Sequence, residues 1–87
     1  MELKGRAVLL TGASGGIGRA AALRLARRGA RVALFARRDE PLRALAKEIE
    51  DAGGQALAIP GDVRSTVDAY RAVVETSARF GRFLKME

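Results

Sequence analysis

The chain of 87 residues contains no cysteine, histidine, tryptophan or asparagine. Without cysteine and histidine it has no disulfide framework, thiol nucleophile, Ser-His pair or His/Cys zinc site. Its apolar runs are short and are interrupted by Arg and Gly, so we expect neither a signal peptide nor a membrane-spanning segment. Hydrophobic residues make up 48% of the chain and charged residues 30%, which is typical of a soluble folded domain and favours a cytoplasmic protein.

Positive charge is concentrated in the first part of the chain. Residues 1–38 contain nine basic side chains and one acidic one, a net charge of +8, whereas residues 39–87 carry −2. Such a basic surface attracts nucleic acid or a phosphorylated ligand. Arg24, Arg27 and Arg28 have helical spacing and also fit a solvated helix face. Nucleic acid is the weaker option, because aromatic residues are only 5% of the chain and form no interleaved platform.

Three short apolar runs alternate with three helical segments. The runs predict strands buried on both faces, since one-sided burial would produce alternation, and they cover residues 7–10, 32–35 and 56–59. Helices are expected after the first run, from a cap at Asp39, and from a cap at Ser65 to Gly81. Short connections favour right-handed crossovers and a parallel sheet in the order 3-2-1. The predicted fold class is α/β, a three-layer partial Rossmann fold forming one truncated domain over residues 1–87.

The third predicted helix carries the only tyrosine of the chain. Ser65 and Asp68 at its start have the spacing of a capping box. We expect its inner face to consist of Tyr70, Val73, Val74, Ser77 and Phe80. Tyr70 is therefore predicted to be a core residue and not a catalytic one.

The octet Thr11-Gly12-Ala13-Ser14-Gly15-Gly16-Ile17-Gly18 lies between the first strand and the first helix. Gly12 allows a sharp turn, Gly16 allows backbone to approach a pyrophosphate, and Gly18 allows the helix to pack closely. The N–H groups of the first helical turn then face the anion. A tight turn alone does not need this many glycines. The candidate cofactor-binding residues here are Gly12, Ser14, Gly15, Gly16, Ile17 and Gly18.

The octet resembles the Thr-Gly-x-x-x-Gly-x-Gly fingerprint of the short-chain dehydrogenase/reductase family, with Thr11, Gly12, Gly16 and Gly18 in the fixed positions. The resemblance continues through residues 31–34 and 61–63 to about Gly81, which is nearly the whole chain. It implies the N-terminal nucleotide-binding half of an oxidoreductase of this family, whose ligand is a dinucleotide or an adenosine phosphate.

The residues after the second strand select the cofactor. Folds that prefer NAD place Asp or Glu here, but this chain reads Phe35-Ala36-Arg37-Arg38. Ala36 removes an acid that would repel a 2′-phosphate, and the guanidinium of Arg37 suits one, so we expect weakly bound NADP(H) with Arg38 nearby. Asp39 is the rival ribose ligand and is interpreted as a helix cap. Gly15 departs from many NADP-using relatives, which carry a basic residue there.

Asp62 and Val63 follow the third strand. In the family, an Asp at this place accepts a hydrogen bond from the adenine amino group, and the next residue contacts the ring through its backbone. The matching register favours this role for Asp62 and Val63. The alternative is a simple turn that leads into the cap at Ser65.

The resemblance also shows which family residues have no counterpart here. Family enzymes continue with an Asn-Asn-Ala-Gly motif, a catalytic Ser and a Tyr-x-x-x-Lys pair, whereas this chain has no Asn and Tyr70 is followed by Val74. We therefore expect no catalytic residue and no hydride transfer by this chain alone. Without a fourth strand, the first strand would be an exposed apolar edge, which predicts a homo-oligomer through that edge. The alternative function is a self-associating module that binds no nucleotide.

Overall fold

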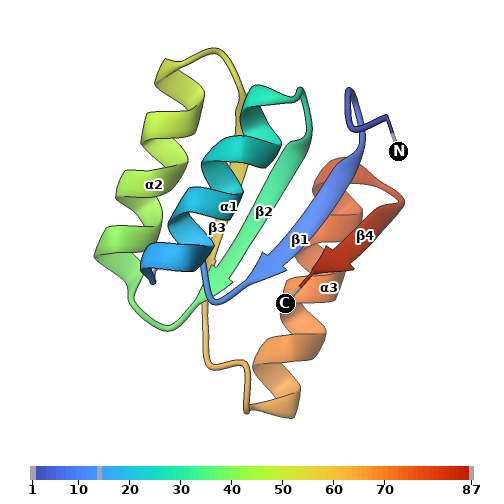
Figure 1. Cartoon of the computed structure of the whole chain (residues 1–87). Coiled ribbons are helices and arrows are strands. Elements are labelled where there is room, and N and C mark those ends of the chain that lie inside the picture. The colour runs from blue at the N-terminus through green and yellow to red at the C-terminus, as the bar shows by residue number, and fades with distance from the viewer. Residues whose placement is uncertain (1, 14, 87) are drawn as a thin grey trace.

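Strands and helices alternate along the chain in the computed structural model, which describes residues 2–13 and 15–86. The elements are β1 (Ala7–Thr11), α1 (Gly16–Arg27), β2 (Arg31–Ala36), α2 (Asp39–Asp51), β3 (Gln55–Pro60), α3 (Thr66–Phe80) and β4 (Phe83–Met86). The helices α1 and α2 cover one face of the sheet and α3 lies on the other, so the three-layer α/β prediction is confirmed (Figure 1). In the described part of the chain, no helix has both the length and the apolar character needed to cross a bilayer.

The sheet is parallel and has the strand order β3-β2-β1-β4. The predicted order of the first three strands is correct, but the prediction of a three-stranded sheet is wrong. Residues 83–86 form β4, in which Leu84 pairs with Val8. The strand β1 therefore has a neighbour on each side, so the predicted exposed β1 edge is wrong, while the formation of a homo-oligomer stays a prediction. The free edge on this side of the sheet belongs to β4.

Alternate residues of the strands build two separate cores. Val8, Leu10, Val32 and Leu34 lie in the core under α1 and α2, together with helix residues that include Leu42, Leu45 and Ile49. Leu9 and Phe35 belong to the core under α3, which also contains Ala7, Ala33, Ile59, Ala72 and Phe80. Both faces of β1 and β2 are thus covered, which explains why their sequences read as continuous apolar runs.

The face that α3 turns to the sheet differs from the predicted one. The buried residues of α3 are Ala72, Thr76 and Phe80, and the hydroxyl of Thr76 donates to the Ala72 carbonyl at 2.7 Å. Small side chains at two of these positions allow the helix to approach the sheet closely. Tyr70 is 71% exposed, so its assignment to the core is wrong. The inner-face prediction also fails for Val73, Val74 and Ser77, which are exposed, and holds for Phe80.

The starts of α2 and α3 test the two predicted caps. Ser65 caps α3 as predicted, because its Oγ accepts a hydrogen bond from the Asp68 N–H at 3.2 Å. The helix α2 begins at Asp39 and its N-cap is Arg38, so the predicted cap is wrong by one residue. Asp39 still contributes negative charge to the first turn, and its carboxylate forms an ion pair with Arg43 one turn later.

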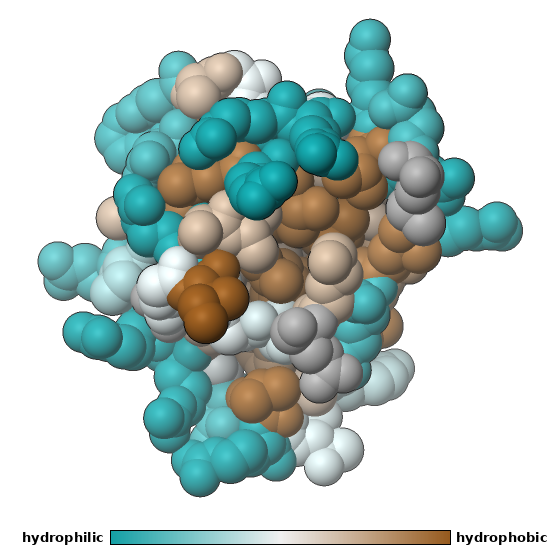
Figure 2. Space-filling view, viewed as in Figure 1, coloured by the Kyte–Doolittle hydropathy of each residue, from teal (hydrophilic) through white to brown (hydrophobic). Residues whose placement is uncertain are grey.

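Apolar side chains remain exposed on both sides of β4. Figure 2 shows hydrophobic surface beside α1, over the part of the sheet that neither α1 nor α2 covers. Leu84 and Met86 of β4 are 36% and 43% exposed, and Met86 lines a pocket of about 260 Å³ with Leu3 and Leu25. On the opposite face, Tyr70 belongs to a second exposed apolar set, which also contains Val63, Val67, Val73 and Val74.

Candidate functional site

The predicted ligand-binding residues lie in three loops, and in the first turn of α1, at the end of the sheet where the strands have their carboxyl ends. Adjacent parallel strands have their carboxyl ends at the same edge, which is where open α/β sheets bind ligands. Gly12, Gly15 and Gly16 follow β1, Arg37 and Arg38 follow β2, and Asp62 and Val63 follow β3. Ser14, also predicted to bind the cofactor, lies outside the described residues. The sequence-predicted residues that the structure describes are thus brought to a single surface.

The loop after β1 turns sharply at Gly12. This residue has a φ of +73°, which is strained for residues other than glycine, and its N–H donates to the Phe35 carbonyl at 2.9 Å. Gly15 is the N-cap of α1 in an extended conformation and has no side chain to cap the helix. The first turn of α1 contains no acidic residue, so the positive end of the helix dipole has no carboxylate of that turn beside it.

Gly16 and Gly18 differ in the space around them. A Cβ on Gly18 would lie 2.1 Å from the Gly12 oxygen and 2.9 Å from the Ala13 Cα, so α1 contacts the loop backbone here. A Cβ on Gly16 would meet no atom of the described residues within 4 Å. The glycine at 18 is thus explained by packing within the chain, whereas the glycine at 16 faces open space. Ile17 between them is 91% exposed.

Two exposed arginines follow β2. Arg37 and Arg38 come directly after Ala36, which is only 8% exposed. Among residues 2–13 and 15–86, neither arginine forms an ion pair. Asp39, the rival ribose ligand, is paired with Arg43. The two arginines therefore place positive charge at this end of β2 that no carboxylate of the described residues pairs with directly, which suits a phosphate site.

The carboxylate of Asp62 is bound by Arg64. Its Oδ1 accepts from the Arg64 backbone N–H at 2.9 Å and from Nε at 3.3 Å, and its Oδ2 accepts from Nη2 at 3.3 Å. The hydrogen bonds from the side chain and then the backbone of Arg64 lower the pKa of Asp62, and the charges of Arg64 and Arg37 add to this effect. The pKa of Arg64 is raised by the same pair. Asp62 is therefore ionised and able to accept hydrogen bonds at neutral pH.

Two residues of α3 fix the backbone of this loop. The Asp68 carboxylate accepts from the Asp62 N–H at 2.9 Å, and Nη2 of Arg71 donates to the Pro60 carbonyl at 2.6 Å. The capping-box pattern indicated a role for Asp68, but its carboxylate reaches Asp62 instead of returning to Ser65. No sequence signal pointed to Arg64 or Arg71, whose roles depend on local conformation and on packing respectively.

Comparison with known proteins identifies this arrangement. A family model described as short chain dehydrogenase matches residues 6–84. The chain belongs to the short-chain dehydrogenase family. One curated relative is the L-rhamnose 1-dehydrogenase (NAD(P)(+)) of Sphingomonas sp. (strain SKA58), which is 44% identical over 81 residues. That match covers 92% of this chain and 32% of the enzyme, so the chain spans about a third of the length of this short-chain dehydrogenase relative.

Solved short-chain dehydrogenase structures show the same fold. A metagenomic short-chain oxidoreductase in complex with NADP has a TM-score of 0.88 and 38% identity, covering 99% of this chain and 39% of that one. The L-sorbose reductase of Gluconobacter frateurii, complexed with NADPH and L-sorbose, has a TM-score of 0.87 and 30% identity. It covers 93% of this chain and 32% of the reductase.

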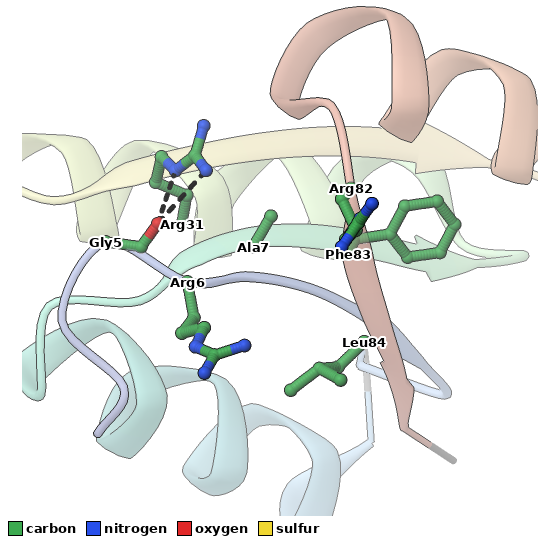
Figure 3. A pocket seen from close by; sticks show the side chains of 7 residues that line it. All are labelled: Gly5, Arg6, Ala7, Arg31, Arg82, Phe83 and Leu84. Atoms are coloured by element: carbon green, nitrogen blue, oxygen red, sulfur yellow. Dashed lines mark hydrogen bonds between the residues drawn. The ribbon is translucent and has the colours of Figure 1, made fainter. Parts of the chain in front are cut away.

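Two pockets lie near opposite ends of the strands of the sheet. One of about 280 Å³ lies between α3 and the sheet, and it includes Thr11 and Val63 from the candidate site. The other, of about 310 Å³, lies at the opposite edge and is lined by residues that include Arg6, Arg31 and Arg82 (Figure 3). The Arg31 guanidinium donates to the Gly5 and Phe80 carbonyls, so it joins the start of β2 to the end of α3. Arg31 is therefore explained by the fold and does not indicate a ligand site.

Proposed function

We propose that this chain is the NADP(H)-binding part of a short-chain dehydrogenase/reductase-type oxidoreductase. The bound cofactor would supply hydride chemistry, which the chain itself does not contain. Gly12, Gly15, Gly16 and Ile17 would hold the pyrophosphate through the loop and the start of α1, and Gly18 would let α1 pack close enough to this loop to form the site. The single observation that carries the proposal is the space at Gly16: a Cβ there would meet no atom of the described residues within 4 Å, whereas a Cβ on Gly18 would clash with the backbone of Gly12 and Ala13.

The preference for NADP(H) over NAD(H) rests on the end of β2. Ala36 offers no carboxylate to a ribose 2′-hydroxyl, and Arg37 with Arg38 would bind a 2′-phosphate. Two solved relatives contain NADP and NADPH, which supports the same choice. Gly15 lacks the basic side chain of many NADP-using relatives, so we expect a dissociation constant on the order of 10⁻⁵–10⁻³ M.

Asp62 and Val63 would hold the adenine ring. The ionised carboxylate of Asp62 lies at the carboxyl edge and has accepting capacity left for an amino group. Catalysis is not part of the proposal for this chain alone. Tyr70 is exposed, but the residue four positions later is Val74, so α3 does not carry the Tyr-x-x-x-Lys spacing of the family's catalytic pair. We therefore expect nucleotide binding without turnover, and a cytoplasmic location stays a prediction.

Calorimetry with 2′-phospho-AMP and AMP tests the nucleotide site. We expect 2′-phospho-AMP to bind about tenfold more tightly, a difference of ~1.4 kcal/mol from the charge-assisted contact with Arg37. Arg37→Ala is expected to remove most of this difference. Arg28→Ala is the control, because it deletes another exposed positive charge, at the end of α1 far from the candidate site. Equal affinities for the two ligands, or equal effects of both substitutions, would contradict an NADP-type site.

The exposed apolar surface around β4 favours a second candidate, a self-associating module. Leu84 and Met86 lie on one side of this edge strand, and Tyr70 and Val73 lie on the other. Unpaired strand edges flanked by apolar surface promote association with another chain. Sedimentation equilibrium tests this proposal, since a monomer at millimolar concentration contradicts it. Persistence of an oligomer without any nucleotide-induced rise in melting temperature would favour it over the NADP(H) site.

A further inference from the structure

The loop at Asp62 combines a fixed backbone with an exchangeable side-chain partner. Its N–H donates to Asp68 at 2.9 Å, and its carbonyl accepts from the Ser65 N–H at 2.9 Å. The carboxylate, by contrast, is bound by the side chain of Arg64, which is 75% exposed. Exposed ion pairs are weak and exchange readily. Contacts with α3 and its cap therefore fix the backbone of Asp62, while the side chain of Arg64 determines how many hydrogen-bonding sites of the Asp62 carboxylate are already used.

The hydrogen bonds from Arg64 occupy about three of the four lone-pair sites of the Asp62 carboxylate and leave one open on Oδ2. An ionised carboxylate has about four lone-pair sites. The Arg64 backbone N–H and Nε use Oδ1, and Nη2 uses Oδ2. Removing the Arg64 side chain would free one site on each oxygen and leave the backbone bond in place. The guanidinium therefore reduces the sites open to a ligand amino group from about three to one, and competes with it for the other two.

We propose that Arg64 is a specificity-determining latch, whose side chain occupies the Asp62 carboxylate and is displaced by the amino group of an adenine nucleotide. This inference rests on the proposed function, since it assigns Asp62 to the base. The guanidinium and the amino group are both donors and seek the same acceptor oxygens. Because the displaced pair is solvent-exposed, its removal is expected to strengthen adenine binding only about two- to fivefold.

The latch makes a prediction about the base. Hypoxanthine carries a carbonyl oxygen where adenine carries the amino group, so it cannot donate to Asp62 at that position. Loss of the Arg64 side chain also removes a positive charge, which weakens every phosphorylated ligand to a similar extent. The ratio of affinities for 2′-phospho-AMP and 2′-phospho-IMP cancels this charge effect. We therefore expect Arg64→Ala to raise the ratio in favour of adenine by about two- to fivefold.

The first test needs no ligand. NMR titration of the Asp62 carboxyl is expected to give a higher pKa in Arg64→Ala than in the unsubstituted chain, because the main cause of the lowered pKa is removed. Arg43→Ala is the matched control, since it deletes an exposed arginine paired with a different carboxylate, that of Asp39. An unchanged Asp62 pKa in Arg64→Ala would overturn the latch whatever the nucleotide affinities are.

The second test is a double-mutant cycle measured by calorimetry. It uses the full chain, Arg64→Ala, Asp62→Asn and the double variant, each with both nucleotides. We expect the gain in the adenine ratio from Arg64→Ala to disappear in the Asp62→Asn background. A gain that persists there, or an unchanged ratio, overturns the latch while leaving the NADP(H) site intact. If none of the four proteins binds either nucleotide, both the proposed function and the displacement of Arg64 by adenine are overturned. The titration of the Asp62 carboxyl would then still show whether the ion pair with Arg64 forms.

Discussion

Replacing Gly18 by alanine probes the contact between α1 and the glycine loop. The added Cβ would lie 2.1 Å from the Gly12 oxygen, well inside the 3.0 Å that such contacts essentially never cross. Its other close neighbour, the Ala13 Cα at 2.9 Å, is also backbone, so no side chain can rotate away. Either α1 or the loop must move by about 1 Å, and closely packed interiors resist such shifts.

The expected loss of stability follows from two opposing effects. Overpacking of this kind costs about 1–3 kcal/mol. Alanine recovers roughly 0.5–1 kcal/mol over glycine inside a helix. Because both clashing groups are backbone, we take the upper end of the first range and expect a net loss of about 2 kcal/mol. For a chain of this length that lowers the melting temperature by roughly 8–16 °C, a large part of a total stability of about 4–13 kcal/mol.

Urea denaturation followed by circular dichroism measures this effect, with Gly16→Ala as the control. At Gly16 the new methyl group meets no atom of the described residues within 4 Å, so we expect the free energy of unfolding to stay within about 0.5 kcal/mol of that of the unsubstituted chain. Equal midpoints for the two variants would refute the packing argument. Under the proposed function, Gly16→Ala should nevertheless abolish nucleotide binding, which separates the role of the site from that of the fold.

Further predictions concern caps, core and pH. Ser65→Ala removes the α3 cap and should cost about 1 kcal/mol in the same urea assay. Phe80→Ala removes a buried side chain and should lower the free energy of unfolding by about 3–5 kcal/mol, whereas Tyr70→Ala should lower it by less than about 1 kcal/mol. The reverse order would show that α3 is rotated about its axis. Asp62 has a folded pKa below its ordinary value of 3.8, so its contribution to stability is present above that pH and is lost as pH falls through the folded pKa. Urea midpoints measured from pH 6 to pH 2 should therefore fall less steeply in Arg64→Ala than in the unsubstituted chain.

The sequence predicts most of the sheet because its strands are buried on both faces. The runs at residues 7–10, 32–35 and 56–59 each lie within an observed strand that extends one residue further at one end or both. Gly81 marks the end of the third helix as expected, and both Gly81 and Gly29, which follows the first helix, have positive φ values. That the candidate ligand-binding residues lie near one another follows from parallel pairing alone, since adjacent parallel strands bring their carboxyl ends together.

The errors arise where side chains are small or patterns are short. The strand β4 has only four residues and includes Lys85, so its apolar pattern is too brief to distinguish a strand from a tail. In α3, larger apolar side chains such as Tyr70 outline one face, but small Ala72 and Thr76 form the buried one. Hydrophobic periodicity gives most weight to large residues and therefore selects the wrong face here. The hold of Arg64 on Asp62 depends on loop dihedral angles, which composition and spacing do not specify.

The two cores of this sheet constrain the length of β1 more strictly than its composition. Val8 and Leu9 are adjacent in the sequence but belong to different helical layers. Exchanging one aliphatic residue for another perturbs a single layer, whereas deleting one residue would send the side chains on one side of the deletion to the wrong layer. Deep mutational scanning should therefore find this strand permissive to aliphatic replacement and intolerant of every single-codon insertion or deletion.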